Sequence, residues 1–274
     1  MLIPFECSIS NISRMKSLVG NINKITGKTT SRRIPHEIDA SNNEFYQGLL
    51  RQCELENGII DGSDLQTLNF PFDEEEYNIF ISYSHNDENE AVFLYQWFTS
   101  HGLTCFLDST IWHCADKLLK NIDNRYCLAA DLAHYDYVKR NFSTSHVHAM
   151  LSMAILEAID RSECCLFIKS NNSVLLKEGI ETKTLSPWIY EENLLMDKIR
   201  RKEPSRFHSK GIRKFSNGGK LIVEDASENL RISYDLQCEF KPITGDELFS
   251  LKSVEALDIL YEKKGIVSRN KLHG

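Results

Sequence analysis

Apolar residues recur with two different periods along this chain, and the period indicates which segments are strands and which are helices. Residues 77–81 form an apolar run of strand length. The next segment carries the stripe of an amphipathic helix, with apolar residues at positions i, i+3, i+4 and i+7: Ala91, Leu94, Tyr95 and Phe98. A second apolar run covers residues 103–107. Strand, helix and strand within about thirty residues predict a βαβ unit, and hence a parallel sheet.

The alternation of helix and strand patterns repeats in the second half of the chain. Residues 147–159 keep the helical period and lead into the apolar run 164–168, which predicts a third strand. A helix is then predicted from Ser186 to residue 199, because serine favours the N-cap and the following proline favours the first turn. Further elements are predicted toward the C-terminus: strands at 220–223 and 230–236, and a helix at 246–264. The pattern predicts a three-layer α/β domain with helices around a central parallel sheet.

The first part of the chain has a different pattern. Helical spacing occurs in two stretches, one around Val19 and one around Leu49, with Asn57 and Gly58 as a stop signal. An acidic run occupies residues 73–76, and the strand pattern begins directly after it. We therefore predict a small helical accessory region of open role over residues 1–72, and the α/β domain over residues 73–274.

Composition limits the classes of function that fit this chain. The 274 residues are 42% hydrophobic, which is enough for a core, but no apolar run is long enough to cross a membrane and the N-terminus lacks a signal-peptide pattern. The eight cysteines form no CxxC pair, which favours reduced, mostly buried thiols. A net charge of −7 disfavours nucleic acid as the main partner, and no histidine or cysteine spacing matches a zinc site. We expect a cytoplasmic protein with no membrane, nucleic-acid or metal partner.

Ligands of parallel sheets bind at the carboxyl ends of the strands, where loops and helix N-termini converge. Candidate site residues are therefore those that follow a predicted strand. After the first strand these are Ser82, Tyr83, Ser84 and His85; after the second, Asp108 and a loop with Trp112; after the third, a polar loop leading to a helix with Trp188 and Glu192. The sequence thus predicts a site that combines an aromatic plane with a carboxylate.

Trp188 and Glu192 are four residues apart in a predicted helix, so they share one face, with Cβ atoms about 6 Å apart. This pair suits cleavage of the bond between nicotinamide and ribose in NAD+. An indole can stack on the pyridinium cation, and a fixed carboxylate stabilises the positive charge that develops on the sugar. Nicotinamide leaves as a neutral molecule, so no second carboxyl group has to protonate it. NAD+ is expected as a substrate, and no cofactor is predicted.

Three sequence blocks, in this order, resemble the TIR (Toll/interleukin-1 receptor) family. They are YNIFISYS at residues 77–84, FLD at 106–108 and SPWIYEE at 186–192. The resemblance extends from residue 77 to the last predicted helix and implies a flavodoxin-like fold. The chain departs from the family by extra residues between 120 and 147, and by a fourth strand displaced by residues 203–219.

The resemblance also implies roles for individual residues. In NAD-cleaving members of the family, the glutamate four residues after the tryptophan of the third block is catalytic, which selects Glu192 over Glu191. Tyr83, Ser84 and His85 would border the nucleotide, and the loop after the second strand is mobile in the family. The binding residues expected on this basis, together with the stacking argument, are Tyr83, Ser84, His85, Asp108, Trp112 and Trp188.

A TIR segment behind an unrelated leader is similar to bacterial antiphage proteins, including the Thoeris signal producers. This resemblance implies that NAD+ is converted into a cyclic or conjugated ADP-ribose that activates a separate effector, and that the enzyme assembles into a homo-oligomer. The sequence leaves two other functions open. One is a TIR module that only binds other proteins, and the other is a related α/β enzyme that cleaves deoxynucleosides.

Overall fold

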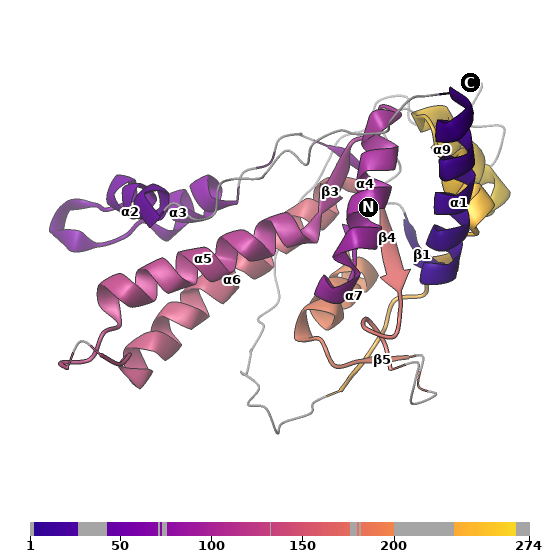
Figure 1. The fold of residues 1–274 in the computed structure, drawn as a ribbon. Helices are drawn as coiled ribbons and strands as arrows, with labels where there is room; N and C mark the ends of the chain where they lie inside the picture. Colours follow the sequence, from indigo (N-terminus) through magenta and orange to yellow (C-terminus); the bar gives the residue numbers. More distant parts are fainter. Residues whose placement is uncertain are drawn as a thin grey trace, which may run out of the picture.

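The structure is a computed structural model of the chain. It describes residues 3–26, 43–70, 72, 76–131, 133–175, 180, 182–199 and 233–266. Within these ranges, the side chains of residues 21–26, 43, 44, 57 and 108–114 lie outside the description. Five of the described strands form one sheet, and helices cover both of its faces (Figure 1).

The central sheet has the strand order β3–β2–β4–β1–β7. The strands are β1 (Ile3–Ser8), β2 (Tyr77–Ser82), β3 (Cys105–Leu107), β4 (Ser162–Lys169) and β7 (Lys241–Pro242). Every neighbouring pair is parallel. The predicted α/β class with a central parallel sheet is confirmed, and the arrangement is consistent with a flavodoxin-like fold.

Strand β1 is the main departure from the prediction, which had no strand before residue 73. β1 lies between β4 and β7 and pairs with β4 along its whole length. Ile3, Phe5 and Cys7 are buried with a strand's period of two, but Pro4 near the start and Glu6 between the apolar positions obscure this pattern in the sequence. The sheet therefore takes strands from both sides of the predicted boundary. Counted from β3, β1 is the fourth strand of the sheet, and this corresponds to the fourth position of the flavodoxin-like order 2-1-3-4-5.

The described remainder of residues 1–72 is helical. α1 (Ile9–Thr26) follows β1 directly, and the later helices are α2 (Asn43–Gln52), a one-turn 3-10 helix (Glu56–Gly58) and α3 (Gly62–Asn69). α1 packs beside the sheet with the C-terminal helices, whereas α2 and α3 pack on α5 and α6 (Figure 1). Only α2 and α3 thus resemble the accessory region that was predicted.

One face of the sheet is covered by α1, α4 (Glu88–Ser100), α8 (Gly245–Ser250) and α9 (Val254–Lys263). Their apolar side chains form one buried core with Ile79 and Ile81 of β2. Successive residues of a strand point to opposite faces, so the residue between these two, Phe80, lies in a second core.

The second core covers the other face of the sheet and contains apolar side chains of α5 (Asp108–Tyr126), α6 (Tyr137–Arg161) and α7 (Pro187–Lys198). α5 and α6 form a hairpin that projects beyond the sheet (Figure 1). The residues predicted as extra, between 120 and 147, form its outer part. There the buried Asp123 of α5 accepts hydrogen bonds from Ser143 Oγ of α6 at 2.5 Å and from Arg140 Nε at 3.1 Å.

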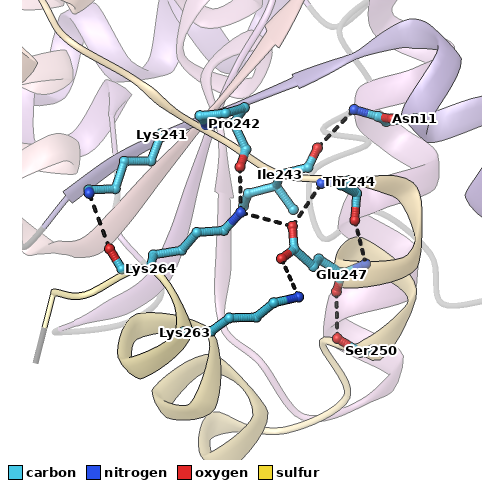
Figure 2. Close-up of polar contacts among 9 residues, drawn as sticks. All are labelled: Asn11, Lys241, Pro242, Ile243, Thr244, Glu247, Ser250, Lys263 and Lys264. Carbon is cyan, nitrogen blue, oxygen red and sulfur yellow. Dashed lines mark hydrogen bonds and ion pairs between the residues drawn. The ribbon is translucent and has the colours of Figure 1, made fainter. Parts of the chain in front are cut away.

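The C-terminal segment is held to the edge of the sheet by a polar cluster around Glu247 (Figure 2). Glu247 forms a capping box with Thr244 at the start of α8. Its carboxylate also binds Lys263 Nζ at 2.7 Å and Lys264 Nζ at 3.0 Å, at the end of α9. Lys264 Nζ donates a further hydrogen bond to the carbonyl oxygen of Pro242 in β7, at 2.7 Å. The helix predicted over 246–264 is therefore two helices, which Glu247 connects.

The two late strands of the prediction are not part of the described sheet. Residues 220–223 lie outside the described residues. Within the described part of 230–236, which begins at residue 233, the structure has β6 (Tyr234–Asp235), which pairs antiparallel with β5 (Lys183–Thr184) in a small separate sheet. The fourth and fifth places of the central sheet belong instead to β1 and β7.

The state of the cysteines and the character of the helices bear on the predictions from composition. Seven cysteines in the described part of the chain are buried, and none of them forms a disulfide. Across the described residues, no helix has both the length and the apolar character needed to cross a membrane.

Candidate active site at the carboxyl ends of β2 and β4

Helix α7 carries two of the predicted site residues, and its start is fixed by the local sequence. Ser186 is the N-cap, and its side-chain oxygen accepts a hydrogen bond from the backbone N–H of Ile189 at 3.3 Å. Pro187 occupies the first turn, where its missing N–H costs no helical hydrogen bond. The helix start predicted at Ser186 is confirmed.

Glu192 is buried at the carboxyl end of β2. Only 1% of the residue is exposed, and its Oε2 accepts a hydrogen bond from Ser82 Oγ at 2.5 Å. Ser82 ends β2 and shares a strand face with Phe80, the face that α7 covers. The carboxylate is therefore fixed at the edge of the sheet where α/β proteins bind their ligands.

Trp188 lies one turn before Glu192 on the same face of α7, as its spacing predicted. The indole is half-buried and packs against the second core. The ring of His148 on α6 meets it edge-on, with centroids 5.2 Å apart and an interplanar angle of 85°. Trp188 thus has a packing role, and it also retains exposed surface that a ligand could contact.

Two more polar side chains of α7 are buried beside Glu192: Glu191, 4% exposed, and Asn193, 2% exposed. Burial raises the pKa of the Glu191 carboxyl, and a hydrogen bond with Ser152 of α6 opposes part of this effect. Asn193 Oδ1 accepts a hydrogen bond from the backbone N–H of Gln237 at 2.6 Å. Of the three adjacent side chains, Glu192 faces the end of β2, Glu191 faces α6, and Asn193 anchors the segment before β7.

The residues predicted directly after β2 have different environments. Tyr83 is 2% exposed and belongs to the core on the opposite face of the sheet. Ser84 is half-buried and precedes a one-turn 3-10 helix, and His85 is exposed in that turn. Ser82, which the strand-end rule nominated and the family resemblance did not, donates a hydrogen bond to Glu192.

Asp108 was expected at the end of β3 and Trp112 in the loop that follows it. Both lie in the first turns of α5 instead, because that helix begins directly where β3 ends. Their side chains lie outside the described residues. The described site therefore consists of Trp188 and Glu192 on α7 together with Ser82 at the end of β2.

A polar network that the sequence analysis did not single out connects the segments after β2 and β4. Asp87 is 4% exposed; its Oδ2 accepts a hydrogen bond from Ser170 Oγ at 2.5 Å, and its Oδ1 accepts one from Asn172 Nδ2 at 2.7 Å. A sequence signal was present, since the buried strand β4 runs directly into the small polar residues 170–173. Such residues are typical of turns whose side chains bind the backbone.

The chemistry that the described site offers is that of one fixed carboxylate, hydroxyl groups and an indole. Within the described residues, no group of three or more His, Cys, Asp or Glu side chains is placed to hold a metal ion. Comparison with protein-family models, curated proteins and solved structures finds no match to this chain. Interpretation of the function therefore depends on the site geometry and on the three sequence blocks.

Proposed function

We propose that this chain is a TIR-type enzyme that cleaves the bond between nicotinamide and ribose in NAD+. The observation that carries the proposal is the buried carboxylate of Glu192, held by Ser82 at the carboxyl end of β2. A ligand bound at this edge of an open parallel sheet lies across the ends of the strands. Its scissile bond would therefore meet a carboxylate that is already oriented.

Glu192 would supply negative charge to the transition state. Breaking the bond to nicotinamide builds positive charge on the ribose, as in glycoside hydrolysis. A carboxylate stabilises that charge most when it is held in a fixed orientation away from water, because it does not have to reorganise during the reaction. The hydrogen bond from Ser82 supplies this fixed orientation.

Trp188 would hold the leaving group. Stacking of an indole on a pyridinium cation contributes about 0.5–2 kcal/mol, depending on how far the pair is desolvated. The edge-on contact with His148 fixes the plane of the indole. Glu191 faces α6 and is assigned no part in the reaction, which needs no acid because nicotinamide leaves as a neutral molecule.

The nucleophile that reaches the ribose decides the product. Water gives ADP-ribose, an adenine nitrogen of the same molecule gives a cyclic isomer, and another small molecule gives a conjugate. On the resemblance to bacterial antiphage TIR proteins, we propose that the product is a signal that activates a separate effector. The same resemblance supports a homo-oligomer, and the absence of a signal-peptide pattern in the sequence supports a location in the cytoplasm.

A protein-binding role without chemistry is the second candidate, and the outer part of α6 favours it. Tyr137, Val138 and Phe142 are 79%, 74% and 69% exposed. Exposed apolar patches often mark protein interfaces. Under this alternative, Glu192 is a buried polar residue of the fold and has no substrate.

Release of nicotinamide from NAD+ distinguishes the two candidates. The wild-type chain should release nicotinamide, and Glu192→Gln should lower the rate by about 100-fold or more, the effect typical of losing one electrostatic catalytic group. The matched control is Glu191→Gln, which changes the adjacent buried carboxyl and should stay within about fivefold of wild type. Assays over a range of protein concentrations, with a crowding agent, ensure that assembly is not limiting. Equal release by wild type and Glu192→Gln contradicts the proposal, and mass spectrometry of the product identifies the nucleophile.

A further inference from the structure

A closed ring of side-chain contacts surrounds the carboxyl ends of β2 and β4. Ser82 at the end of β2 binds Glu192 of α7. Ile189, earlier on α7, shares a buried apolar cluster with Val174 of the loop after β4 and Phe167 of β4. That loop is bound by Asp87, which lies a few residues beyond Ser82. The ring returns to the segment where it began, so it connects β2, α7 and the loop after β4.

The carboxylate of Asp87 serves this ring and not its own helix. Asp87 is the N-cap residue of α4, a position where aspartate normally accepts a hydrogen bond from the first turn. Its side chain makes no such bond. It accepts hydrogen bonds from Ser170 Oγ and Asn172 Nδ2 instead, and it does so almost completely shielded from water. Hydrogen bonds to an ionised acceptor are about twice as strong as neutral ones, so this link is a firm one.

The loop after β4 is organised around the hydroxyl that Asp87 binds. Ser170 Oγ accepts the backbone N–H groups of Asn172 at 2.9 Å and Ser173 at 3.1 Å. Ser173 Oγ in turn accepts the backbone N–H of Ser170 at 2.9 Å. The Ser170 hydroxyl thus receives two N–H groups and gives its own hydrogen to Asp87. Val174 follows this turn directly and is 3% exposed, in the apolar cluster that also contains Phe167 and Ile189.

We infer that Asp87 is a positioning residue for Glu192. By holding the loop after β4, it sets the position of Val174 and, through the apolar cluster that Val174 shares with Ile189, the position in which α7 presents Glu192 to the end of β2. Ser82 fixes one side of the Glu192 carboxylate directly, and Asp87 fixes the helix that carries it. The catalytic consequence rests on the proposed cleavage of NAD+, whereas the structural consequence for α7 does not.

Asparagine is a weaker replacement for Asp87 in this network. Both oxygens of the carboxylate accept, one from a hydroxyl that already receives two N–H groups and one from an amide NH2. With its NH2 toward Ser170, an asparagine meets a hydroxyl whose acceptor positions are taken, and one hydrogen bond is lost. With its NH2 toward Asn172, both hydrogen bonds persist only if the Asn172 amide also turns over, and both are then neutral and about half as strong. Asparagine is as good an N-cap as aspartate and has nearly the same shape, so α4 itself is little affected.

The test compares Asp87→Asn with Glu88→Gln, which removes a charge from the next residue, an exposed one, in the first turn of α4. Two measurements are made on the full chain: hydrogen–deuterium exchange of backbone amides, and steady-state kinetics of nicotinamide release. In Asp87→Asn, exchange over residues 170–175 and α7 should rise by about tenfold, since these amides lose a tertiary constraint. The kcat should fall by about tenfold with KM within about threefold of wild type, because the reacting carboxylate is misplaced. Glu88→Gln should change neither quantity.

A double-mutant comparison identifies the route of the effect. If Asp87 acts through Glu192, Asp87→Asn should have no further effect on the residual rate of Glu192→Gln. If Asp87→Asn lowers the residual rate of Glu192→Gln by the same factor of about ten, the inference is wrong. Unchanged exchange in α7 of Asp87→Asn, or an unchanged kcat of this variant, also overturns it. If the wild-type chain releases no nicotinamide, the proposed function fails, and the exchange result alone then decides the positioning of α7. If Asp87→Asn is unfolded, Ser170→Ala, which removes one of the two hydrogen bonds, takes its place in every comparison.

Discussion

Ser82 and Glu192 are joined by a 2.5 Å hydrogen bond although 110 residues separate them along the chain. Ser82 ends the strand β2, and Glu192 lies in the middle of α7, so this bond couples the edge of the sheet to the helix. The donor can be removed while the carboxylate is kept. The contribution of orientation is therefore experimentally separable from the contribution of charge.

Ser82→Ala tests the value of that orientation. We expect kcat for nicotinamide release to fall by about tenfold, because a carboxylate free to rotate stabilises the ribosyl cation less well. The free energy of unfolding should also fall, by about 1–3 kcal/mol, since a buried carboxylate oxygen loses a partner. Ser17→Ala, at an exposed position of α1, is the control and should retain full activity. Full kcat in Ser82→Ala would mean that the bond only stabilises the fold.

Trp188→Ala tests the stacking role of the indole. We expect KM for NAD+ to rise by about 3- to 30-fold, the equivalent of the stacking energy, and Trp188→Phe to lie between this variant and wild type. Steady-state kinetics over a range of NAD+ concentrations measure the change. The control is Trp97→Phe, which alters a tryptophan in the core on the opposite face. An unchanged KM in Trp188→Ala would leave Trp188 as a packing residue of the α6–α7 contact.

Glu247 makes the C-terminal segment sensitive to acid. Burial alone would raise the pKa of Glu247, but hydrogen bonds from Lys263, from the backbone N–H of Thr244 and from Lys264 outweigh it and lower the pKa to about 2, from an ordinary value of 4.5. A group with a lowered pKa in the folded state stabilises the fold above its ordinary pKa, and this stabilisation disappears as the pH falls toward the folded value.

We therefore expect Glu247→Gln to lower the free energy of unfolding by about 1–2 kcal/mol near neutral pH. The difference from wild type should shrink as the pH falls from about 4.5 and vanish near pH 2. Urea unfolding at a series of pH values measures it, with the exposed Glu239→Gln as control. A difference that stays constant with pH would rule out the ion pairs as its source.

Substitution by alanine at Gly245 and at Gly48 should change the stability of the protein in opposite directions. A Cβ atom at Gly245 would lie 2.5 Å from the carbonyl oxygen of Asn11 and 3.1 Å from Cβ of Arg14, so α8 would have to move away from α1. We expect Gly245→Ala to destabilise the protein by about 1–3 kcal/mol. A Cβ at Gly48, inside α2, meets nothing within 4 Å, so Gly48→Ala should stabilise by about 0.5–1 kcal/mol. Thermal unfolding of the two variants checks both signs.

A chain that starts at residue 73 tests the predicted domain boundary. It lacks β1 and α1, which contribute Phe5, Ile12 and Met15 to the first core. Natural domains are stable by only about 5–15 kcal/mol. Each buried apolar side chain contributes about 1.5–3 kcal/mol, so the loss of several of them removes a stability of that size. We therefore expect no cooperative unfolding transition. Circular dichroism during thermal unfolding measures this, and a chain of residues 1–274 is the control. A folded, cooperative shorter chain would show that β1 is dispensable.

Local periodicity predicted those elements whose pattern is uninterrupted and ends at a turn or cap residue. The apolar runs of β2 and β4 and the Ser186 cap of α7 are of this kind. β1 was missed because Pro4 and Glu6 interrupt a short strand whose partners lie far along the chain, and no local pattern encodes a distant partner. The network of Asp87 and Ser170 was missed for the same reason, since polar residues that bind across the sheet edge have no period.

The candidate site was predicted in its location and only partly in its members. The strand-end rule placed Ser82 and Glu192 at one edge of the sheet, because that rule depends on topology alone. The strand-end rule and the family resemblance both nominated Tyr83, but neither specifies the direction of a side chain, and Tyr83 lies in the opposite core. The resemblance to TIR enzymes and the cleavage of NAD+ stay predictions for the assays above.

The central place of β1 has a consequence for the synthesis of this protein on the ribosome. β1 is made before the other described strands, yet one of its sheet neighbours is β4, with Ile3 beside Cys164, and the other is β7, with Phe5 beside Lys241. Pairings of such high sequence separation form slowly and only after both partners exist. The nascent chain must therefore keep an apolar strand unpaired until β4 and β7 have been made. A chaperone that binds the segment around β1 would protect it during this interval.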